Sequence, residues 1–328
     1  MLTILNDLHI GAIRTGGTTP RSAYALRGYL LEQFETLLGK TNSDLMILGD
    51  LFDTGSVPLP DLLATYRALD KWLALGHKLY LVAGNHDLSR NSAAMSSFQF
   101  LSQLLQGRAV SILEPTLTPY GYVIPHVANQ DLFNSALEGM PEADVLFVHC
   151  NYNNDFAQES DHSLNMSRDQ ARAAPVKHIV FGHEHNTRTK LAGKVVIPGN
   201  QVSSSVSDCL AGEVKQLTTV AGSTVTLIPV EHQPKYEEVD WRTPQSEAQF
   251  IRVTGTATAE EAPDAVSKVS RLRQSSEAFV VTNAIEVLGD ALDEKFAASL
   301  AEVQAFDVLQ ALKDLLTADE VKILESLK

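Results

Sequence analysis

Short apolar segments alternate with longer segments of helical spacing through the first two hundred residues of the chain. The apolar segments are LTIL, LMIL, LYLVA, VLFV and HIVF, at residues 2–5, 45–48, 79–83, 145–148 and 178–181. Continuously apolar runs of this length are typical of strands buried on both faces. Between them, residues 25–39 and 60–76 repeat apolar positions at steps of three and four, as amphipathic helices do. The pattern therefore predicts a layered α/β architecture.

The pattern changes in the second half of the chain. Residues 194–206 and 215–230 are rich in Val and Thr and interrupted by turn residues, which predicts antiparallel strands closing a sheet. Residues 233–246 are polar and contain two prolines, so we place a domain boundary there. We therefore expect a domain over 1–235, a compact strand–helix–strand domain over 245–290, and a helical segment over 293–328.

The helical segment at the end of the chain contains neither proline nor glycine, and Thr317 with Glu320 has the form of a capping box. We expect two helices there, with a break near Thr317. Their apolar stripe could pack on the body of the protein or dock a partner.

Composition restricts the class of protein. No apolar run approaches the roughly 18 residues of a membrane span, and the first residues lack the pattern of a signal peptide, so we expect no membrane partner and a cytoplasmic location. The two cysteines are expected to be free thiols. The net charge of -14 argues against nucleic-acid binding through bulk positive charge. A phosphate-bearing substrate would need a local positive charge, which bound cations could supply.

Candidate metal ligands follow every one of the five apolar segments. They are, in chain order, Asp7 and His9, then Asp50, then Asn85, then His149, then His183 and His185. The carboxyl ends of strands in an open α/β sheet are where ligand crevices form, so these distant residues can converge. A single residue of this kind would more often be a hydrogen-bonding cap, but the repetition at five places favours a shared site.

The residue types and spacing favour a site for two metal ions. In an extended segment residues i and i+2 face the same way, so Asp7 with His9, and His183 with His185, can each face one pocket. The ligands are oxygen and nitrogen atoms without a thiolate, which suits manganese, iron or zinc. Seven ligands exceed what one ion needs, whereas two ions sharing a carboxylate would use them all.

The order DxH, GDxxD, GNHD, a lone histidine and GHxH resembles the calcineurin-like metallophosphoesterases over residues 1 to about 205. Residues 49–87 are further similar to the nuclease subunit of SbcCD-type complexes. This resemblance implies a four-layer α/β/β/α sandwich with a small α/β capping domain and a C-terminal helical hairpin. It also implies a metal-dependent DNA nuclease, active as a 3'-to-5' exonuclease on duplexes and an endonuclease on single strands.

The same resemblance implies roles for individual residues. One metal ion would be held by Asp7, His9, Asp50 and His185, and the other by Asp50, Asn85, His149 and His183. His86 would be the catalytic histidine and Asp53 the residue that orients it. Manganese is the expected metal, DNA the substrate, a coiled-coil ABC-type ATPase the partner of the C-terminal helices, and a homodimer the expected assembly.

Several neighbouring residues have plainer interpretations. We expect Asp87 to cap a following helix, Glu184 to point away from the histidines into solvent, and Cys150 to lie in the core. His126 is expected to lie outside the site. The basic residues of the helix in the second domain, Lys268, Arg271 and Arg273, form either a solvated face or a contact with DNA phosphates.

Two other functions stay open at this point. One is a phosphodiesterase or phosphatase that acts on a small molecule or a phosphoprotein, which would need neither the capping domain nor the tail. The other is a binding scaffold with a relict metal site, although such proteins usually lose ligands and this chain keeps all seven.

Overall fold

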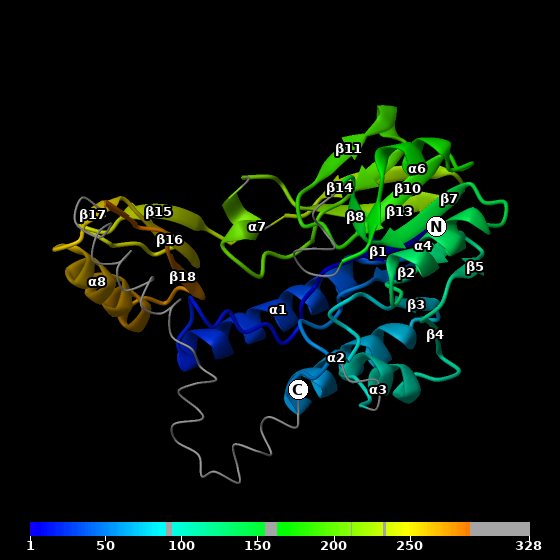
Figure 1. The fold of residues 1–328 in the computed structure, drawn as a ribbon. Coiled ribbons are helices and arrows are strands. Elements are labelled where there is room, and N and C mark those ends of the chain that lie inside the picture. Colours follow the sequence, from blue (N-terminus) through cyan, green and yellow to red (C-terminus); the bar gives the residue numbers. More distant parts are fainter. Residues whose placement is uncertain (90–93, 155–162, 211, 232–233, 289–328) are drawn as a thin grey trace, which may run out of the picture.

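The computed structural model describes residues 1–89, 94–154, 163–210, 212–231 and 234–288. Two large sheets form the body of the molecule, with helices on their outer faces, and a smaller module lies to one side (Figure 1). The expected C-terminal helices at 293–328 lie outside the described residues. Within the described residues, no helix is both long enough and apolar enough to cross a membrane.

The first large sheet has the strand order β14-β13-β1-β2-β3-β4. Strands β1 to β4 run parallel, while β13 pairs antiparallel with β1 and with β14. Their bounds are β1 Leu2–Leu5, β2 Asp44–Leu48, β3 Leu79–Val82, β4 Ala109–Ile112, β13 Gln216–Ala221 and β14 Thr224–Pro229.

The second large sheet has the order β11-β12-β10-β7-β6-β5. Its bounds are β5 Thr116–Thr118, β6 Gly121–Ile124, β7 Val145–His149, β10 His178–Gly182, β11 Arg188–Lys190 and β12 Val195–Ile197. Strands β6, β7, β10 and β12 run parallel, and the antiparallel strands β5 and β11 form the two edges. Strand β12 pairs antiparallel with β11, as expected for residues 194–206, but it also pairs parallel with β10, and residues 199–206 form no strand.

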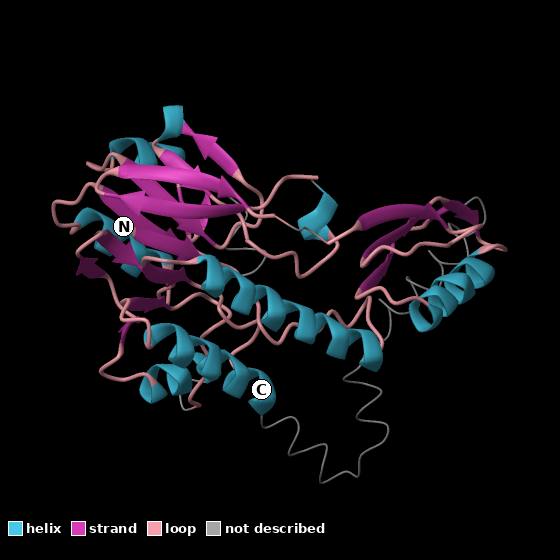
Figure 2. Ribbon diagram, turned by 180° about the vertical axis from the view of Figure 1, so that it is seen from behind, coloured by secondary structure: helices cyan, strands magenta, loops and turns pink. Residues whose placement is uncertain are grey.

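Three apolar layers hold the four structural layers together. Between the sheets, Ile4, Met46 and Val82 of the first sheet pack with Phe147 and Val180 of the second. On its outer face the first sheet is covered by α1 (Pro20–Lys40), α2 (Leu59–Leu73) and α3 (Ser97–Leu104). The second sheet is covered by α4 (Gln130–Glu138) and α6 (Arg168–Ala173), which are labelled in Figure 1. Figure 2 shows the same arrangement of sheets and helices from behind. The continuously apolar strands are thus buried on both faces, and the predicted α/β/β/α sandwich is confirmed.

The first helix illustrates why the sequence folds in this way locally. Thr19 caps α1 in a capping box with Ser22, and Pro20 occupies the first turn, where its missing N–H costs nothing. Leu26, Leu30 and Phe34 then recur every four residues and form the buried stripe. The remaining short elements are β8 (Asn151–Tyr152), β9 (Asn165–Met166), the 3-10 helix η1 (Leu191–Gly193) and α7 (Ser207–Leu210).

The smaller module contains a parallel sheet of order β15-β16-β18, a pair β17-β19, and helix α8. Their bounds are β15 Tyr236–Asp240, β16 Phe250–Thr254, β17 Thr256–Thr258, α8 Ala262–Ser275, β18 Val280–Asn283 and β19 Glu286–Leu288. The expected strand–helix–strand order is present. Strand β15, however, comes from the polar stretch in which we placed the boundary, and it belongs to the sheet of this module.

The smaller module contacts the N-terminal end of α1. The rings of Tyr29 and Phe279 lie 4.9 Å apart, and the N–H of Val281 donates to the carbonyl of Gly17 over 2.8 Å. Phe250 and Val280 are buried in the same apolar cluster as the core under α1. The two parts of the chain therefore share a packed interface.

Candidate metal centre

The candidate ligands meet where the parallel strands of both sheets end. Asp7 and His9 follow β1, Asp50 follows β2, and Asn85 and His86 follow β3. From the second sheet, His149 ends β7, while His183 and His185 follow the neighbouring β10. The structure brings all seven sequence-predicted ligands and His86 together in overlapping groups.

The first group joins residues from the two sheets. Ligand atoms of Asp7, His9 and His185 lie within 4.8 Å of one another. Nε2 of His9 and Nε2 of His185 are 3.1 Å apart. Asp7 is fixed by the N–H of His183, which lies 3.0 and 2.9 Å from its two carboxylate oxygens, and by Nδ2 of Asn6 at 2.6 Å.

The second group surrounds Asn85. Ligand atoms of Asp50, His149 and His183 lie within 4.8 Å of one another. Oδ1 of Asn85 is 3.1 Å from Nε2 of His149 and 3.0 Å from Nδ1 of His183. Oδ2 of Asp50 is 3.4 Å from Nε2 of His149.

Hydrogen bonds at the outer ring nitrogens fit the metal-ligand interpretation. A carbonyl oxygen can only accept, so Nδ1 of His149, 3.0 Å from the carbonyl oxygen of Leu48, carries a proton. Nδ1 of His185 likewise faces Oδ1 of Asp208 at 2.7 Å. In both rings Nε2 is then the nitrogen with a lone pair for a metal ion. Because Nε2 of His185 also faces Nε2 of His9, a proton or a metal ion is needed between these two atoms.

Asp50 lies at the junction of the two groups. It is buried, belongs both to the His149 group and to a group with His9 and His86, and accepts the N–H of His86 at 2.9 Å with Oδ1. Burial alone would raise the pKa of Asp50, but the surrounding imidazoles, His149 first, hold that pKa well below its usual value. The reciprocal effect of Asp50 outweighs burial at His149 and raises the pKa of that imidazole to about 9.

His86 is held by the backbone of Asp53. Its Nδ1 lies 2.6 Å from the Asp53 carbonyl oxygen and therefore donates to it. The Asp53 carboxylate instead accepts from Nη1 of Arg14 at 2.9 Å, and its Oδ1 lies 3.2 Å from Nδ1 of His9 without hydrogen-bond alignment. The contact that orients His86 is therefore made by the main chain of Asp53, and its side chain serves the first ligand group.

The backbone at the site is strained. Asp7, His9, Asp50 and His183 have φ of 53°, 46°, 48° and 84°, in the left-handed region that residues with a side chain rarely adopt. Such conformations cost of order 1–3 kcal/mol each and cluster at functional sites. Four of the seven candidate ligands therefore adopt a conformation that local propensity would not favour.

Three glycines before the ligands leave room for side chains of the site. A Cβ atom at Gly84 would lie 2.1 Å from Oδ1 of Asp50, and one at Gly49 would lie 2.0 Å from Nδ1 of His149. At Gly182 it would lie 2.4 Å from the Leu48 carbonyl oxygen. Gly49, Gly84 and Gly182 are thus required because neighbouring loops approach these positions too closely for a side chain.

Two expectations about neighbouring residues were wrong. Asp87 caps no helix among the described residues; it is fully buried and accepts the N–H groups of Phe52 at 3.0 Å and Gly84 at 2.9 Å, which ties the loops after β2 and β3 together. Burial and the charge of Asp50 raise its pKa to about 8. Glu184 does point away from the histidines, but it is nearly buried, accepts the N–H of Tyr152 at 2.5 Å and pairs with Arg188.

Other expectations for neighbouring residues hold. Cys150 is a buried free thiol whose pKa is raised by burial. His126 belongs to none of the candidate ligand groups found among the described residues.

Sequence reasoning missed residues that support the ligands. Asp208 accepts from His185 with one oxygen and from the N–H groups of Ser204 and Ser205, at 2.7 and 2.9 Å, with the other. Gln201 is linked to Asn6 in both directions, at 2.7 and 3.1 Å, and so holds the loop that carries Asp7. Asp208 and Gln201 lie about 200 residues from the first ligand, in no recognisable motif, so nothing in the sequence indicated them.

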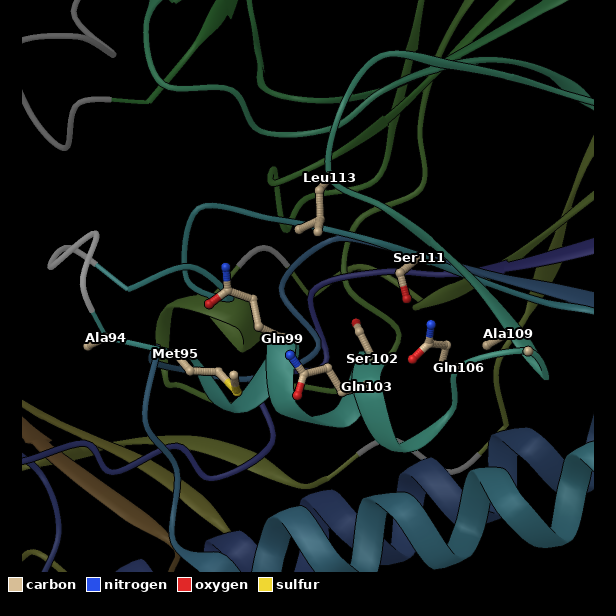
Figure 3. A pocket seen from close by; sticks show the side chains of 10 residues that line it. Ala94, Met95, Gln99, Ser102, Gln103, Gln106, Ala109, Ser111 and Leu113 are labelled. Carbon is tan, nitrogen blue, oxygen red and sulfur yellow. The ribbon is translucent and has the colours of Figure 1, made fainter.

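A surface pocket of about 680 Å³ lies away from this centre, between α3 and β4. Figure 3 shows Gln99 and Gln103 on α3, Gln106 beyond the end of the helix, and Ser111 and Leu113 on the segment above them. Among the described residues, its lining includes none of the candidate ligands and no ionisable side chain.

Comparison with known protein families identifies one that matches the chain. Among curated proteins, none matches the chain. One similar solved structure, described as a novel archaeal phosphodiesterase, covers 70% of this chain and 99% of its own, with 11% identity and a TM-score of 0.34. The profile of the calcineurin-like phosphoesterases matches residues 1–187, which carry all seven candidate ligands. The chain, with its α/β/β/α sandwich and convergent oxygen and nitrogen ligands, belongs to the calcineurin-like phosphoesterase family of metal-dependent hydrolases.

Proposed function

We propose that the chain is a two-metal DNA phosphodiesterase, the nuclease subunit of an SbcCD-like repair or recombination complex. The observation that carries the proposal is the convergence of seven oxygen and nitrogen ligands, with Asp50 shared by two groups, beside a histidine held by a separate contact. A second module packed against α1 next to this body supports a polymeric substrate over a small one.

The residues present fit two divalent cations. One would be held by Asp7, His9, Asp50 and His185, the other by Asp50, Asn85, His149 and His183, with manganese the metal we propose. Such ions lower the pKa of a bound water to near neutrality and neutralise charge on the phosphate. The outer hydrogen bonds of His149 and His185 place a proton on Nδ1 of each ring, so Nε2 is the nitrogen that would bind a metal ion once its own proton is displaced.

His86 supplies the proton transfer. Its Nδ1 proton is committed to the carbonyl of Asp53, so Nε2 is the atom that exchanges a proton with the leaving oxygen. Proton transfer by a positioned side chain contributes about 10²–10⁴-fold to the rate. The ring is also 5.0 Å from that of His9, next to the first ligand group.

The proposed function also includes partner proteins. We propose that the chain forms a homodimer and binds a coiled-coil ABC-type ATPase through residues 293–328. Because the chain carries a net charge of -14, it repels the phosphates of DNA, and the surface of a partner would help it to bind DNA.

The deciding experiment is manganese-dependent cleavage of labelled duplex and single-stranded DNA by the wild type, Asp50→Asn and His86→Ala. We expect both variants to lose at least about a hundredfold in rate, and His77→Gln, whose ring packs on Trp72 away from the ligands, to cleave normally. Undiminished cleavage by both variants would contradict the proposal. Turnover of a small phosphodiester with no cleavage of DNA would instead favour the small-molecule phosphodiesterase.

A further inference from the structure

A second surface crevice, of about 600 Å³, lies between the phosphoesterase body and the smaller module. One wall is formed by residues 13–17, before α1, and by residues 205–210, which include α7. The other wall comes from β16, α8 and β18 of the smaller module. In Figure 1, α7 and the N-terminal end of α1 face this module.

The crevice is positively charged in an acidic protein. Its described lining includes three arginines, Arg14, Arg252 and Arg273, and no aspartate or glutamate. The whole chain carries a net charge of -14. An anionic ligand is therefore favoured here over most of the remaining surface.

Arg273 is the arginine best placed to bind such a ligand. Its Nε donates to the carbonyl of Val281 at 2.9 Å, which fixes the guanidinium, and partial burial lowers its pKa. Within the described part of the chain no carboxylate pairs with it, whereas Arg252 lies 3.1 Å from Oε1 of Glu238 and Arg14 lies 2.9 Å from Oδ1 of Asp53. A fixed guanidinium with N–H groups left over is suited to bind phosphate oxygens.

The crevice is connected to the metal centre through two side chains. Arg14 lines the crevice and binds Asp53, whose Oδ1 lies 3.2 Å from Nδ1 of His9. On the same wall, Ser207 directly precedes Asp208 and Ser205 donates its N–H to it at 2.9 Å, and Asp208 binds His185. A strand that passes through the metal centre would thus reach the crevice within a short distance.

Apolar side chains complete the site. Ile13 and Leu210 line the crevice and each expose nearly half of their surface, 47% and 46%. Such side chains offer contact to a nucleobase beside the arginines that bind its phosphate. The volume lies within the roughly 300–1,000 Å³ of ordinary ligand sites, which is enough for one or two nucleotides.

We propose that this crevice binds the nucleotides next to the cleaved bond of a single-stranded nucleic acid, with Arg273 and Arg252 on the phosphates and Ile13 and Leu210 against a base. This inference rests on the proposed DNA phosphodiesterase activity. It assigns the crevice the role of selecting a polynucleotide over a small phosphodiester at the same metal centre.

The test compares two substrates in manganese: a labelled single-stranded oligonucleotide and the small diester bis(p-nitrophenyl) phosphate. Arg273→Gln should raise KM for the oligonucleotide about tenfold, as expected for one hydrogen-bonded charge, and leave KM and kcat for the small diester unchanged. Arg252→Gln changes the opposite wall and should act in the same direction. Each variant should also reduce the salt dependence of oligonucleotide binding, by about 0.7 in the log–log slope.

The matched control is Arg271→Gln, which removes the same charge from an exposed position of the same helix, two residues away. Equal effects of Arg271→Gln and Arg273→Gln on KM for the oligonucleotide would overturn the proposed binding role of the crevice. The proposed DNA phosphodiesterase activity would not be affected by this result. Equal loss on both substrates by Arg273→Gln and Arg252→Gln would also overturn it. A wild type that hydrolyses only the small diester would refute the DNA phosphodiesterase itself.

Discussion

Oδ1 of Asp208 lies 2.7 Å from Nδ1 of His185, and this pair joins α7 to the candidate ligand that follows β10. Burial alone would raise the pKa of Asp208, but the hydrogen bond and charge of His185 lower it far more. Asp208 is therefore a carboxylate that fixes the tautomer and the orientation of His185.

Asp208→Asn should weaken manganese binding about 10–100-fold, because partners of this kind contribute that much to metal affinity. Calorimetric titration of the metal-free protein measures this directly, without reference to activity. Asp169→Asn is the control, since Asp169 is an exposed aspartate that pairs only with Arg172 among the described residues. Unchanged affinity in Asp208→Asn would show that His185 is positioned by other contacts.

Gly84→Ala should damage the metal centre through a steric clash. The added Cβ would lie 2.1 Å from Oδ1 and 2.3 Å from the backbone nitrogen of Asp50, and the fixed loop after β2 cannot easily move away. We expect loss of manganese binding and a reduction of about 1–3 kcal/mol in the free energy of unfolding.

Gly28→Ala is the matched control for this variant. A Cβ at Gly28 meets no atom within 4 Å, and alanine stabilises a helix relative to glycine by up to about 1 kcal/mol. Urea denaturation and metal titration of both variants would test the contrast. Similar behaviour of the two variants would contradict the close approach at Gly84.

Asp53→Asn should reduce the rate of hydrolysis less than His86→Ala. The carbonyl of Asp53 that binds His86 is retained in Asp53→Asn, whereas His86→Ala removes the proton-transferring group itself. We expect a loss of about 10²–10⁴-fold for His86→Ala and a smaller loss for Asp53→Asn, which weakens the contact with Arg14. Steady-state rates on a small phosphodiester give the comparison, and an equal loss would mean that the Asp53 carboxylate does orient His86.

Tyr120→Phe should lower stability in a pH-dependent way. The Tyr120 hydroxyl donates to Oδ2 of Asp44 at 2.6 Å, and the N–H of Lys78 donates to Oδ1 at 3.0 Å. Burial alone would raise the pKa of Asp44, but these hydrogen bonds outweigh it and the pKa is lowered. A lowered pKa means that the stabilisation is complete above the unfolded value of about 3.9 and is lost as pH falls through the folded value.

The free energy of unfolding of Tyr120→Phe should therefore be about 0.5–1.5 kcal/mol lower than that of the wild type at pH 7. This difference should shrink as the pH drops below about 4. Urea denaturation over this pH range measures the difference, with Tyr24→Phe, an exposed tyrosine, as the control. A difference that does not change with pH would rule out Asp44 as its source.

The sequence by itself determined the layered α/β class and the candidate ligands, and its resemblance to a known family implied the four-layer sandwich. Buried strands must be continuously apolar, and a parallel strand order places their carboxyl ends at one edge, so Asp7, Asp50 and Asn85 could be assigned to one site before any coordinates. The glycines before Asp50, Asn85 and His183 could also be identified from the sequence, because they belong to the motifs. The sequence did not show that a Cβ atom at these positions would clash with a neighbouring loop.

Only the tertiary structure decided which groups support those ligands. Asp208, Asp87 and the carbonyl of Asp53 act through contacts between loops from different strands, and a single residue type in a loop carries no signal of its distant partner. Strand β15 was missed because an exposed strand at a sheet edge needs few apolar residues, and its pairing with β16 comes from a distant segment. The positive crevice likewise exists only where the segment before α1, α7 and the second module meet, because its arginines, Arg14, Arg252 and Arg273, come from three separate segments of the chain.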